Sequence, residues 1–179
     1  MSSPDHPPNM EPSKLSSREC LLLCARSRTA GDADLVSLLR QGVDWAYLLD
    51  QGRRHGLLPL AYDRLRRVDG DPIPPEIMAR LRDNYYGNLA RNVRLQASLA
   101  EAATVLQREG IEPIVLKGGA LAGTVYADPG LRPMTDLDLL VPPEAMERAG
   151  AALSALGYCL SGRLTAQLVT FQAVSYTHL

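Results

Sequence analysis

The hydrophobic pattern of the chain changes its period at Gly110, and this change limits the possible folds more than any other feature. Over residues 77–106, apolar side chains recur every three or four positions, which predicts one long amphipathic helix. Residues 111–116 are instead short, apolar and β-branched, as in a buried strand. We therefore expect a helical module over residues 16–109, followed by an α/β layer over residues 110–172, and an α+β class.

Shorter amphipathic stretches precede the long helix. Ser16 and Glu19 have the spacing of a capping box, which predicts a first helix over about residues 17–28. Asp44 is placed to cap another helix, which we expect to end near Gly56.

The region after Gly110 alternates between strand and helix patterns. We expect strands over residues 111–116 and 136–141, joined by a turn at residues 117–119 and a short helix of small residues over 120–127. A helix over about residues 144–156 and the start of a third strand follow. The strands are expected to form one small mixed sheet.

Composition excludes several classes of protein. The chain has 179 residues, a net charge of −1, 46% hydrophobic residues and 22% charged residues, which is typical of a globular domain. The near-neutral charge argues against a dedicated nucleic-acid coat or a membrane-surface protein. No apolar run approaches the ~20 residues of a spanning helix, and the N-terminus lacks a signal-peptide pattern. We expect a cytoplasmic protein with no membrane partner, and we interpret Cys20 and Cys24 as buried free thiols.

Both ends of the chain depart from the globular pattern. Residues 1–15 are rich in proline and small polar residues, and we expect a disordered lead-in. Residues 173–179 resemble a translated sequencing adapter, so we expect a non-native tail. On this interpretation the natural protein continues beyond about Gln172, and the chain is a fragment.

The first chemical signal is an Asp-x-Asp pattern at Asp136 and Asp138. If both residues lie in one strand, their side chains share a face, about 7 Å apart. Two carboxylates emerging from an apolar strand are costly unless a cation neutralises them, and hard oxygen ligands favour Mg²⁺ or Mn²⁺. The alternative is a strand end with two solvated acids.

The second signal is Lys117-Gly118-Gly119, between a strand and a helix. Glycines let backbone N–H groups approach an anion, the helix N-terminus favours negative charge, and Lys117 adds a point charge. Of the 19 basic residues only two are Lys, so a Lys here suggests that a compact ammonium is needed. This pattern predicts a phosphate-binding turn, with a purely structural turn as the alternative. Neither a Walker A loop nor a dinucleotide fingerprint fits these residues.

A third signal is Arg132, four residues before Asp136. Its guanidinium is suited either to hold a triphosphate or to pair with Asp136, and the sequence leaves both roles open.

Together these motifs resemble an uncharacterised bacterial nucleotidyltransferase family of the DNA-polymerase-β-like superfamily. The similarity covers roughly residues 45–158, and its core comprises the segments 115–121 and 126–141, with Lys-Gly-Gly, Gly-x-Arg and Asp-x-Asp in order. Upstream, Trp45, the His55-Gly56-Leu57-x-Pro59 segment and the pair Arg91-Asn92 are also similar to that family. The resemblance implies a partial nucleotidyltransferase core at residues 110–172.

The resemblance also implies roles for the motif residues. The glycine turn would hold the triphosphate of an NTP, Asp136 and Asp138 would bind two Mg²⁺ ions, and a third acid would come from a later strand. The sequence departs from the family pattern because it has Lys-Gly-Gly without a Ser, so Lys117 would take over phosphate contacts. It also has no acidic residue after Glu147, which places the third acid beyond Gln172 and leaves open whether the fragment is active.

The leading functional hypothesis is a Mg²⁺-dependent nucleotidyltransferase that moves an NMP from an NTP to a hydroxyl of a small molecule, peptide, protein or tRNA. Three alternatives remain open. The first is a non-catalytic module that binds a nucleotide or a protein on the same fold. The second is a toxin-type nucleotidyltransferase acting on tRNA. The third is a helical adaptor that binds through Trp45 and the Arg91-Asn92 helix.

Overall fold

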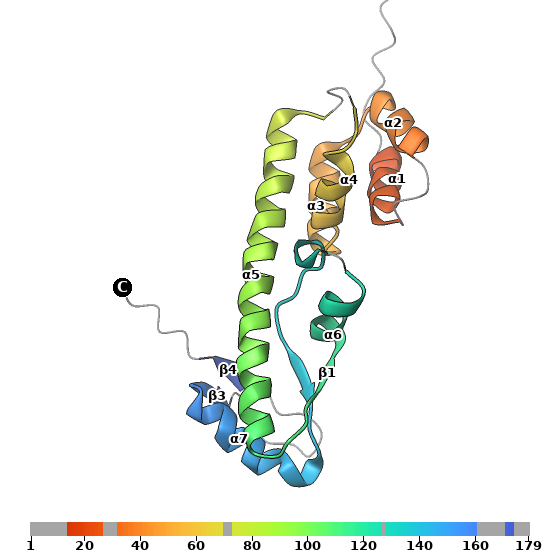
Figure 1. The fold of residues 1–179 in the computed structure, drawn as a ribbon. Coiled ribbons are helices and arrows are strands. Elements are labelled where there is room, and N and C mark those ends of the chain that lie inside the picture. The colour runs from red at the N-terminus through yellow and green to blue at the C-terminus, as the bar shows by residue number, and fades with distance from the viewer. Residues whose placement is uncertain (1–13, 27–31, 70–72, 127, 161–170, 174–179) are drawn as a thin grey trace, which may run out of the picture. The chain divides into compact units, whose positions relative to one another are not determined.

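The computed structural model describes residues 14–26, 32–69, 73–126, 128–160 and 171–173. The chain divides into two compact units (Figure 1). Residues 1–90 and 130–133 form the helical unit, and residues 91–129 and 134–179 form the α/β unit. The lead-in and the tail predicted for the two termini lie almost entirely outside the described residues.

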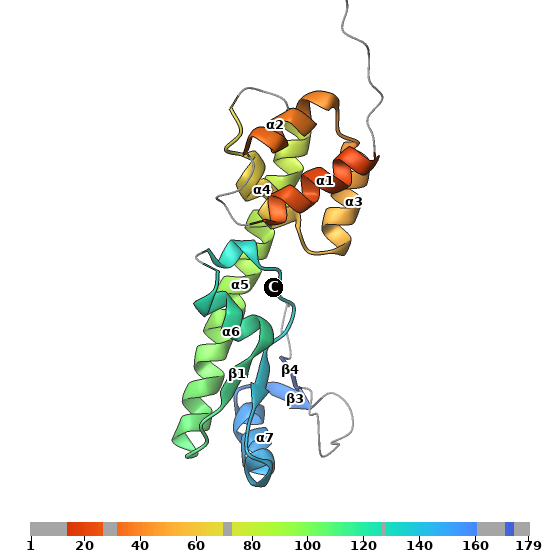
Figure 2. The same ribbon diagram turned by 90° about the vertical axis from the view of Figure 1, so that its right-hand side faces the viewer.

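The helical unit contains four short helices and the first part of a long one. The helices are α1 (Lys14–Ala25), α2 (Asp32–Gln41), α3 (Trp45–Arg54), α4 (Leu58–Leu65) and α5 (Pro75–Arg108). Helix α1 packs against α2, α3 and α4, and Figure 2 shows these four helices beside the start of α5. Their apolar faces bury one aliphatic core, in which Leu35, Leu48 and Leu81 are fully inaccessible to solvent. Amphipathic helices of this length obtain most of their stability from such packing.

The start of α3 is fixed by two hydrogen bonds at Asp44. The Asp44 carboxylate accepts the Tyr47 N–H at 2.9 Å, which confirms the predicted cap, and the Asp44 N–H donates to the Ser17 hydroxyl at 2.8 Å. The predicted capping box at Ser16 is wrong, because α1 already begins at Lys14 and places Ser16 inside the helix. Ser17 is buried in α1, and its hydroxyl helps to fix the start of α3.

The long helix α5 ends as its sequence predicts. Gly110 has a left-handed backbone (φ 69°), and the Gly110 and Ile111 N–H groups donate to the carbonyls of Gln107 and Leu106, each at 2.9 Å. These two bonds form a Schellman motif, whose left-handed position favours glycine. Leu106 and Ile111 then pack in the same core, which directs the chain from the helix into the first strand.

The α/β unit continues through short elements. In chain order they are β1 (Ile114–Leu116), α6 (Lys117–Thr124), the 3₁₀ turn η1 (Pro129–Leu131), β2 (Asp138–Leu140), the 3₁₀ turn η2 (Pro143–Ala145), α7 (Met146–Ala155), β3 (Tyr158–Leu160) and β4 (Phe171–Ala173). Strand β1 pairs with β2, and β3 pairs with β4. Both pairings are antiparallel, where a mixed sheet was expected; the α+β class itself is confirmed.

The strands are shorter than the apolar runs that predict them. Residues 111–113 precede β1, and residues 136–137 precede β2. The predicted turn at residues 117–119 is instead the first turn of α6, because the chain passes directly from β1 into the helix.

The β1–β2 ribbon has one packed face and one open face. Val115 lies opposite Leu139, and Leu139 packs against the core of Leu106, Ile111 and three alanines. Ile114 lies opposite Leu140, and these two side chains are 59% and 52% exposed. Because side chains alternate along a strand, the next pair on this open side is Leu116 with Asp138.

The cysteines are free thiols. Cys20 and Cys24 are buried in the helical unit, as predicted, whereas Cys159 in β3 is exposed. A hydrogen bond with Cys20 and burial raise the pKa of the Cys24 thiol, so it is an unreactive part of the core. In the described part of the chain, no helix combines the length and apolar character needed to cross a bilayer.

Candidate nucleotide and metal site

The β1–β2 register brings the Lys-Gly-Gly and Asp-x-Asp motifs together. Leu116 lies directly opposite Asp138, so Lys117, the next residue, begins α6 beside the start of β2. The Lys117 ammonium donates to Oδ1 of Asp138 at 3.1 Å. Residues separated by 21 positions in the sequence thus form one charged pair on the α/β unit.

This ion pair is accessible to solvent. The Lys117 side chain is 73% exposed and the Asp138 side chain is 27% exposed. Pairs of this kind contribute about 0–1 kcal/mol to folding, because water screens them and two side chains must be ordered. The pair therefore adds little to stability, and its groups stay available to other ions.

The backbone at Lys117 has an unusual conformation. Its φ of 46° is the only positive value at a non-glycine position in the described part of the chain. A left-handed conformation costs an L-residue about 1–2 kcal/mol, and such outliers gather at functional sites. A glycine would adopt this backbone without strain, so the presence of lysine indicates a role for its side chain.

The two glycines lie in the first turn of α6. Leu116 is the N-cap residue and provides no side-chain cap, and the first N–H groups of a helix have no partner within it. A Cβ at Gly119 would lie 2.9 Å from Cγ1 of Val115 and 3.4 Å from Leu137. The glycine at this position is therefore explained by close packing of α6 on the strands, independently of any phosphate.

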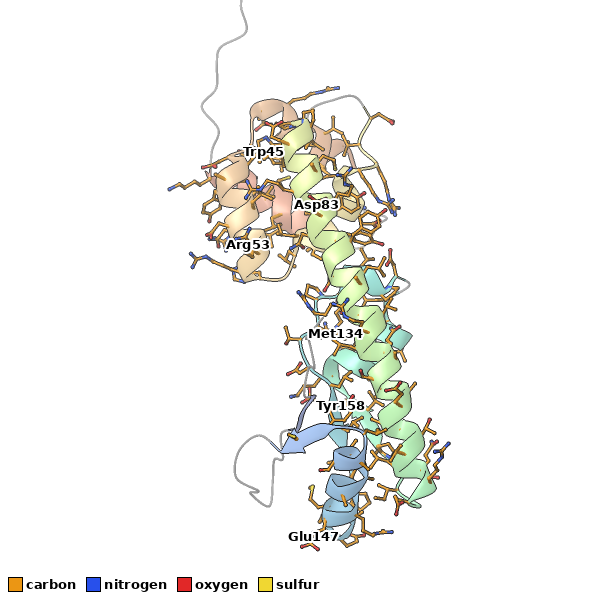
Figure 3. All side chains as sticks on the ribbon, turned by 90° about the vertical axis from the view of Figure 1, so that its left-hand side faces the viewer. Trp45, Arg53, Asp83, Met134, Glu147 and Tyr158 are labelled. Atoms are coloured by element: carbon orange, nitrogen blue, oxygen red, sulfur yellow. The ribbon has the colours of Figure 1, made fainter. Side chains whose placement is uncertain are left out.

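The two aspartates occupy different positions. Asp138 is the first residue of β2 and is half-buried, whereas Asp136 lies before the strand and is exposed. Strand alternation therefore does not by itself place both carboxylates on one face. Met134, labelled in Figure 3, is buried two residues earlier and anchors this segment in the α/β unit.

Arg132 belongs to the segment 130–133, which is part of the helical unit, and it is half-buried. Lys117, Gly118, Gly119, Asp136 and Asp138 all belong to the α/β unit. Contacts of Arg132 with a triphosphate or with Asp136 remain predictions.

Two asparagines of α5 hold the loop that leads toward Asp136, a role that the sequence motifs did not indicate. The Asn92 amide donates to the Pro129 carbonyl, and the Asn88 amide donates to the Gly130 carbonyl at 2.8 Å. Both side chains are buried. The sequence does contain a signal for this role. Asparagine is a poor helix former, and two asparagines four positions apart lie on the same helix face, which indicates that both bind the same neighbouring segment.

The donor set fits a hard divalent cation. Asp136 and Asp138 offer carboxylate oxygens, the ligand type that Mg²⁺ and Mn²⁺ prefer, and Asp138 already accepts a cationic group at hydrogen-bond distance. Within the described residues, no cluster of three or more His, Cys, Asp or Glu side chains could hold a metal ion. These two carboxylates would therefore form part of a ligand set.

Comparison with known protein families identifies the family of the chain. The model of an uncharacterised nucleotidyltransferase family matches residues 41–178, and so covers most of the chain and every motif residue discussed above. Searches of the curated proteins and of the solved structures gave no match. The chain thus belongs to this family of uncharacterised nucleotidyltransferases.

Proposed function

We propose that this protein transfers a nucleoside monophosphate from an NTP to a hydroxyl acceptor with the help of Mg²⁺ or Mn²⁺. The observation that carries the proposal is the juxtaposition of Lys117 and Asp138, which joins the predicted phosphate-binding motif to the predicted metal-binding motif. Membership of the nucleotidyltransferase family supports the reaction class.

In this proposal each motif has one task. Asp136 and Asp138 would bind the divalent cation, which neutralises phosphate charge and orients the α-phosphate. The first-turn N–H groups of Gly118 and Gly119, together with Lys117, would hold the β- and γ-phosphates. Arg132 is proposed as a further phosphate contact.

The reaction would be an in-line displacement. The acceptor oxygen forms a bond to the α-phosphorus as the bond to the bridging oxygen of pyrophosphate breaks, and the hydroxyl proton passes to water. The protein then contributes mainly by positioning the reactants and by stabilising the charge of the transition state, because phosphoryl transfer needs little covalent catalysis.

The test is a transfer assay with α-³²P-labelled NTPs, Mg²⁺ or Mn²⁺, and separate acceptor pools of tRNA, peptides, proteins and hydroxylated small molecules. We expect label in one pool and pyrophosphate in solution, both abolished in the Asp136→Asn/Asp138→Asn variant. Asp83→Asn, an exposed carboxylate in α5, is the matched control and should transfer like the wild type.

The same assay separates the alternatives. Binding of a labelled NTP without pyrophosphate release would favour the non-catalytic nucleotide-binding module. Transfer to tRNA alone would favour the toxin-type hypothesis. Failure to bind any NTP would contradict the proposal.

A further inference from the structure

We propose that Lys117 is an internal counter-ion, which occupies the cation position at Asp138 in the free protein and leaves it for the nucleotide phosphates when the metal enters. The inference rests on the proposed function. It adds that metal and nucleotide bind cooperatively. The ion pair between Lys117 and Asp138 keeps the carboxylate from the metal and the ammonium from the phosphates, so each ligand frees the group that the other needs.

The Lys117 ammonium occupies a metal-ligand position of Asp138. The Lys117 nitrogen lies 3.1 Å from Oδ1 of Asp138, so an ammonium sits at the carboxylate oxygen that a metal would need. An ammonium and a metal ion cannot share this oxygen without strong repulsion. Metal binding through Oδ1 therefore requires that Lys117 moves away, and a metal ion at the second oxygen of the same carboxylate would still be repelled by the nearby ammonium.

The ion pair between Lys117 and Asp138 opens easily. Lys117 is 73% exposed, and its flexible stem allows the ammonium to swing without moving the backbone of α6. An arginine would hold the carboxylate through two parallel bonds and would leave less readily. The other basic side chains near the motifs are arginines. A lysine at this position is therefore the basic side chain that a metal ion can displace from the carboxylate.

The backbone at Lys117 is strained. Its φ of 46° would be free of cost for glycine, and two glycines follow directly. The chain keeps a charged side chain at a position whose backbone favours glycine. This is expected if the ammonium has a task both in the free state, against Asp138, and in the nucleotide-bound state.

The consequence is reciprocal coupling between the two ligands. Metal at Asp138 releases Lys117 for phosphate, and phosphate that captures Lys117 uncovers Asp138 for metal. By linkage, the factor by which one ligand raises the affinity for the other must be the same in both directions. When a metal ion binds without nucleotide, part of its binding free energy is used to break the ion pair between Lys117 and Asp138. It should therefore bind weakly to the nucleotide-free protein.

The experiment measures Mn²⁺ binding to the nucleotide-free full chain by the electron paramagnetic resonance signal of unbound Mn²⁺. Lys117→Met removes the competing charge and should bind Mn²⁺ about three- to tenfold more tightly than the wild type, since the carboxylate is no longer masked. Lys117→Arg should bind more weakly than the wild type. The gain in Lys117→Met should shrink as ionic strength rises from about 0.05 to 0.5 M.

The controls separate this inference from the proposed function. Lys14→Met removes the other lysine of the chain, in α1, and should leave Mn²⁺ affinity unchanged. Asp138→Asn should lose Mn²⁺ binding. Lys117→Gly removes the charge and suits the left-handed backbone, so it replaces Lys117→Met if circular dichroism shows that the methionine variant is unfolded.

Two results would overturn the inference in distinguishable ways. If Asp138→Asn loses Mn²⁺ but the folded charge-removing variant of Lys117 binds it no more tightly than the wild type, the counter-ion inference fails and the proposed metal site stands. If Asp138→Asn binds Mn²⁺ like the wild type, the metal site and the inference fail together.

Discussion

The helical unit and the α/β unit differ in how completely they bury their apolar residues. Among the described residues, the helical core holds fourteen buried side chains, mostly leucine and isoleucine, whereas the α/β core holds five, of which three are alanine. The β1–β2 ribbon also leaves Ile114 and Leu140 exposed. The helical unit is thus built for stability, and the candidate chemistry lies on the less densely packed unit, as is common for functional regions.

The largest expected effect tests this difference in the cores directly. Leu48→Ala removes a fully buried side chain from the helical unit and should lower the free energy of unfolding by about 3 kcal/mol, from lost burial and the cavity left behind. Leu140→Ala, at a half-exposed position in β2, should cost less than about 1 kcal/mol. Urea denaturation measures both, and equal losses would contradict the comparison.

The second prediction concerns the contact between Tyr85 and the loop at Gly130. A Cβ at Gly130 would lie 2.5 Å from Cε2 of Tyr85, so Gly130→Ala should cost about 2 kcal/mol through overpacking. Gly87→Ala, in the same helix as Tyr85 but with open space around it, should instead stabilise by about 0.5–1 kcal/mol.

A double-mutant cycle sharpens this test. In a Tyr85→Leu background, whose smaller side chain leaves room for the new methyl group, Gly130→Ala should lose most of its cost. Thermal melting curves of the wild type, the two single variants and the double variant give the coupling energy between the two positions. If Gly130→Ala costs as much stability in the Tyr85→Leu background as in the wild type, the Tyr85 ring is not the source of the cost.

The third prediction compares two ion pairs of the helical unit, one buried and one exposed. Asp63 in α4 is buried and accepts hydrogen bonds from Arg66 and Arg67, each at 2.7 Å. Burial alone would raise the pKa of this carboxyl, but the two guanidinium groups outweigh burial and hold the pKa below its ordinary value. A carboxyl whose folded pKa is lowered stabilises the fold above its ordinary pKa, about 3.9, and loses this contribution as pH falls through the folded pKa.

Asp63→Asn should therefore lower stability by about 1–2 kcal/mol at pH 7, and the difference from the wild type should vanish in strong acid. The more exposed pair of Asp50 with Arg54 provides the control, since Asp50→Asn should cost at most about 0.5 kcal/mol. Urea titrations between pH 7 and pH 2 measure both series. A difference for Asp63→Asn that persists at pH 2 would mean that packing, and not charge, is responsible.

The smallest expected effect tests whether close packing explains the glycine at position 119 of α6. Gly119→Ala forces its Cβ against Val115 and Leu137, and should lower stability by about 0.5–1 kcal/mol even though alanine favours helix. Gly123→Ala has open space and should raise stability by a similar amount. Differential scanning calorimetry resolves opposite shifts of this size, and shifts of the same sign would remove the packing explanation for Gly119.

Local signals made the helical architecture predictable. The apolar repeat located α5, Gly110 marked its end through a left-handed Schellman position, and Asp44 was identifiable as the cap of α3. Each of these depends on residues close together in the sequence. The capping box at Ser16 failed because α1 already begins at Lys14, before the box. The hydrogen bond that Ser17 accepts from the Asp44 N–H, 27 positions away, is a long-range contact that no local pattern indicates.

The pairing of the two motif strands was predictable, but the contact between their side chains was not. The apolar runs predicted strands over residues 111–116 and 136–141 in one sheet, and the register confirms that β1 and β2 pair. The ion pair between Lys117 and Asp138 could not be predicted, since it depends on which residue faces Leu116 across the ribbon. Strand lengths were overestimated because buried residues such as Ile111 support the core without joining the ladder.

The contact of Tyr85 with Gly130 also provides a spectroscopic reporter. The aromatic ring lies where a side chain of Gly130 would be, so its ring current should shift one of the two glycine Hα resonances strongly from its ordinary position. Gly130 precedes Asp136 by only six residues, and its carbonyl is held by Asn88. A single pair of proton resonances can therefore report, during a titration with metal or nucleotide, whether the loop stays seated on α5 or lifts away as the ligands bind.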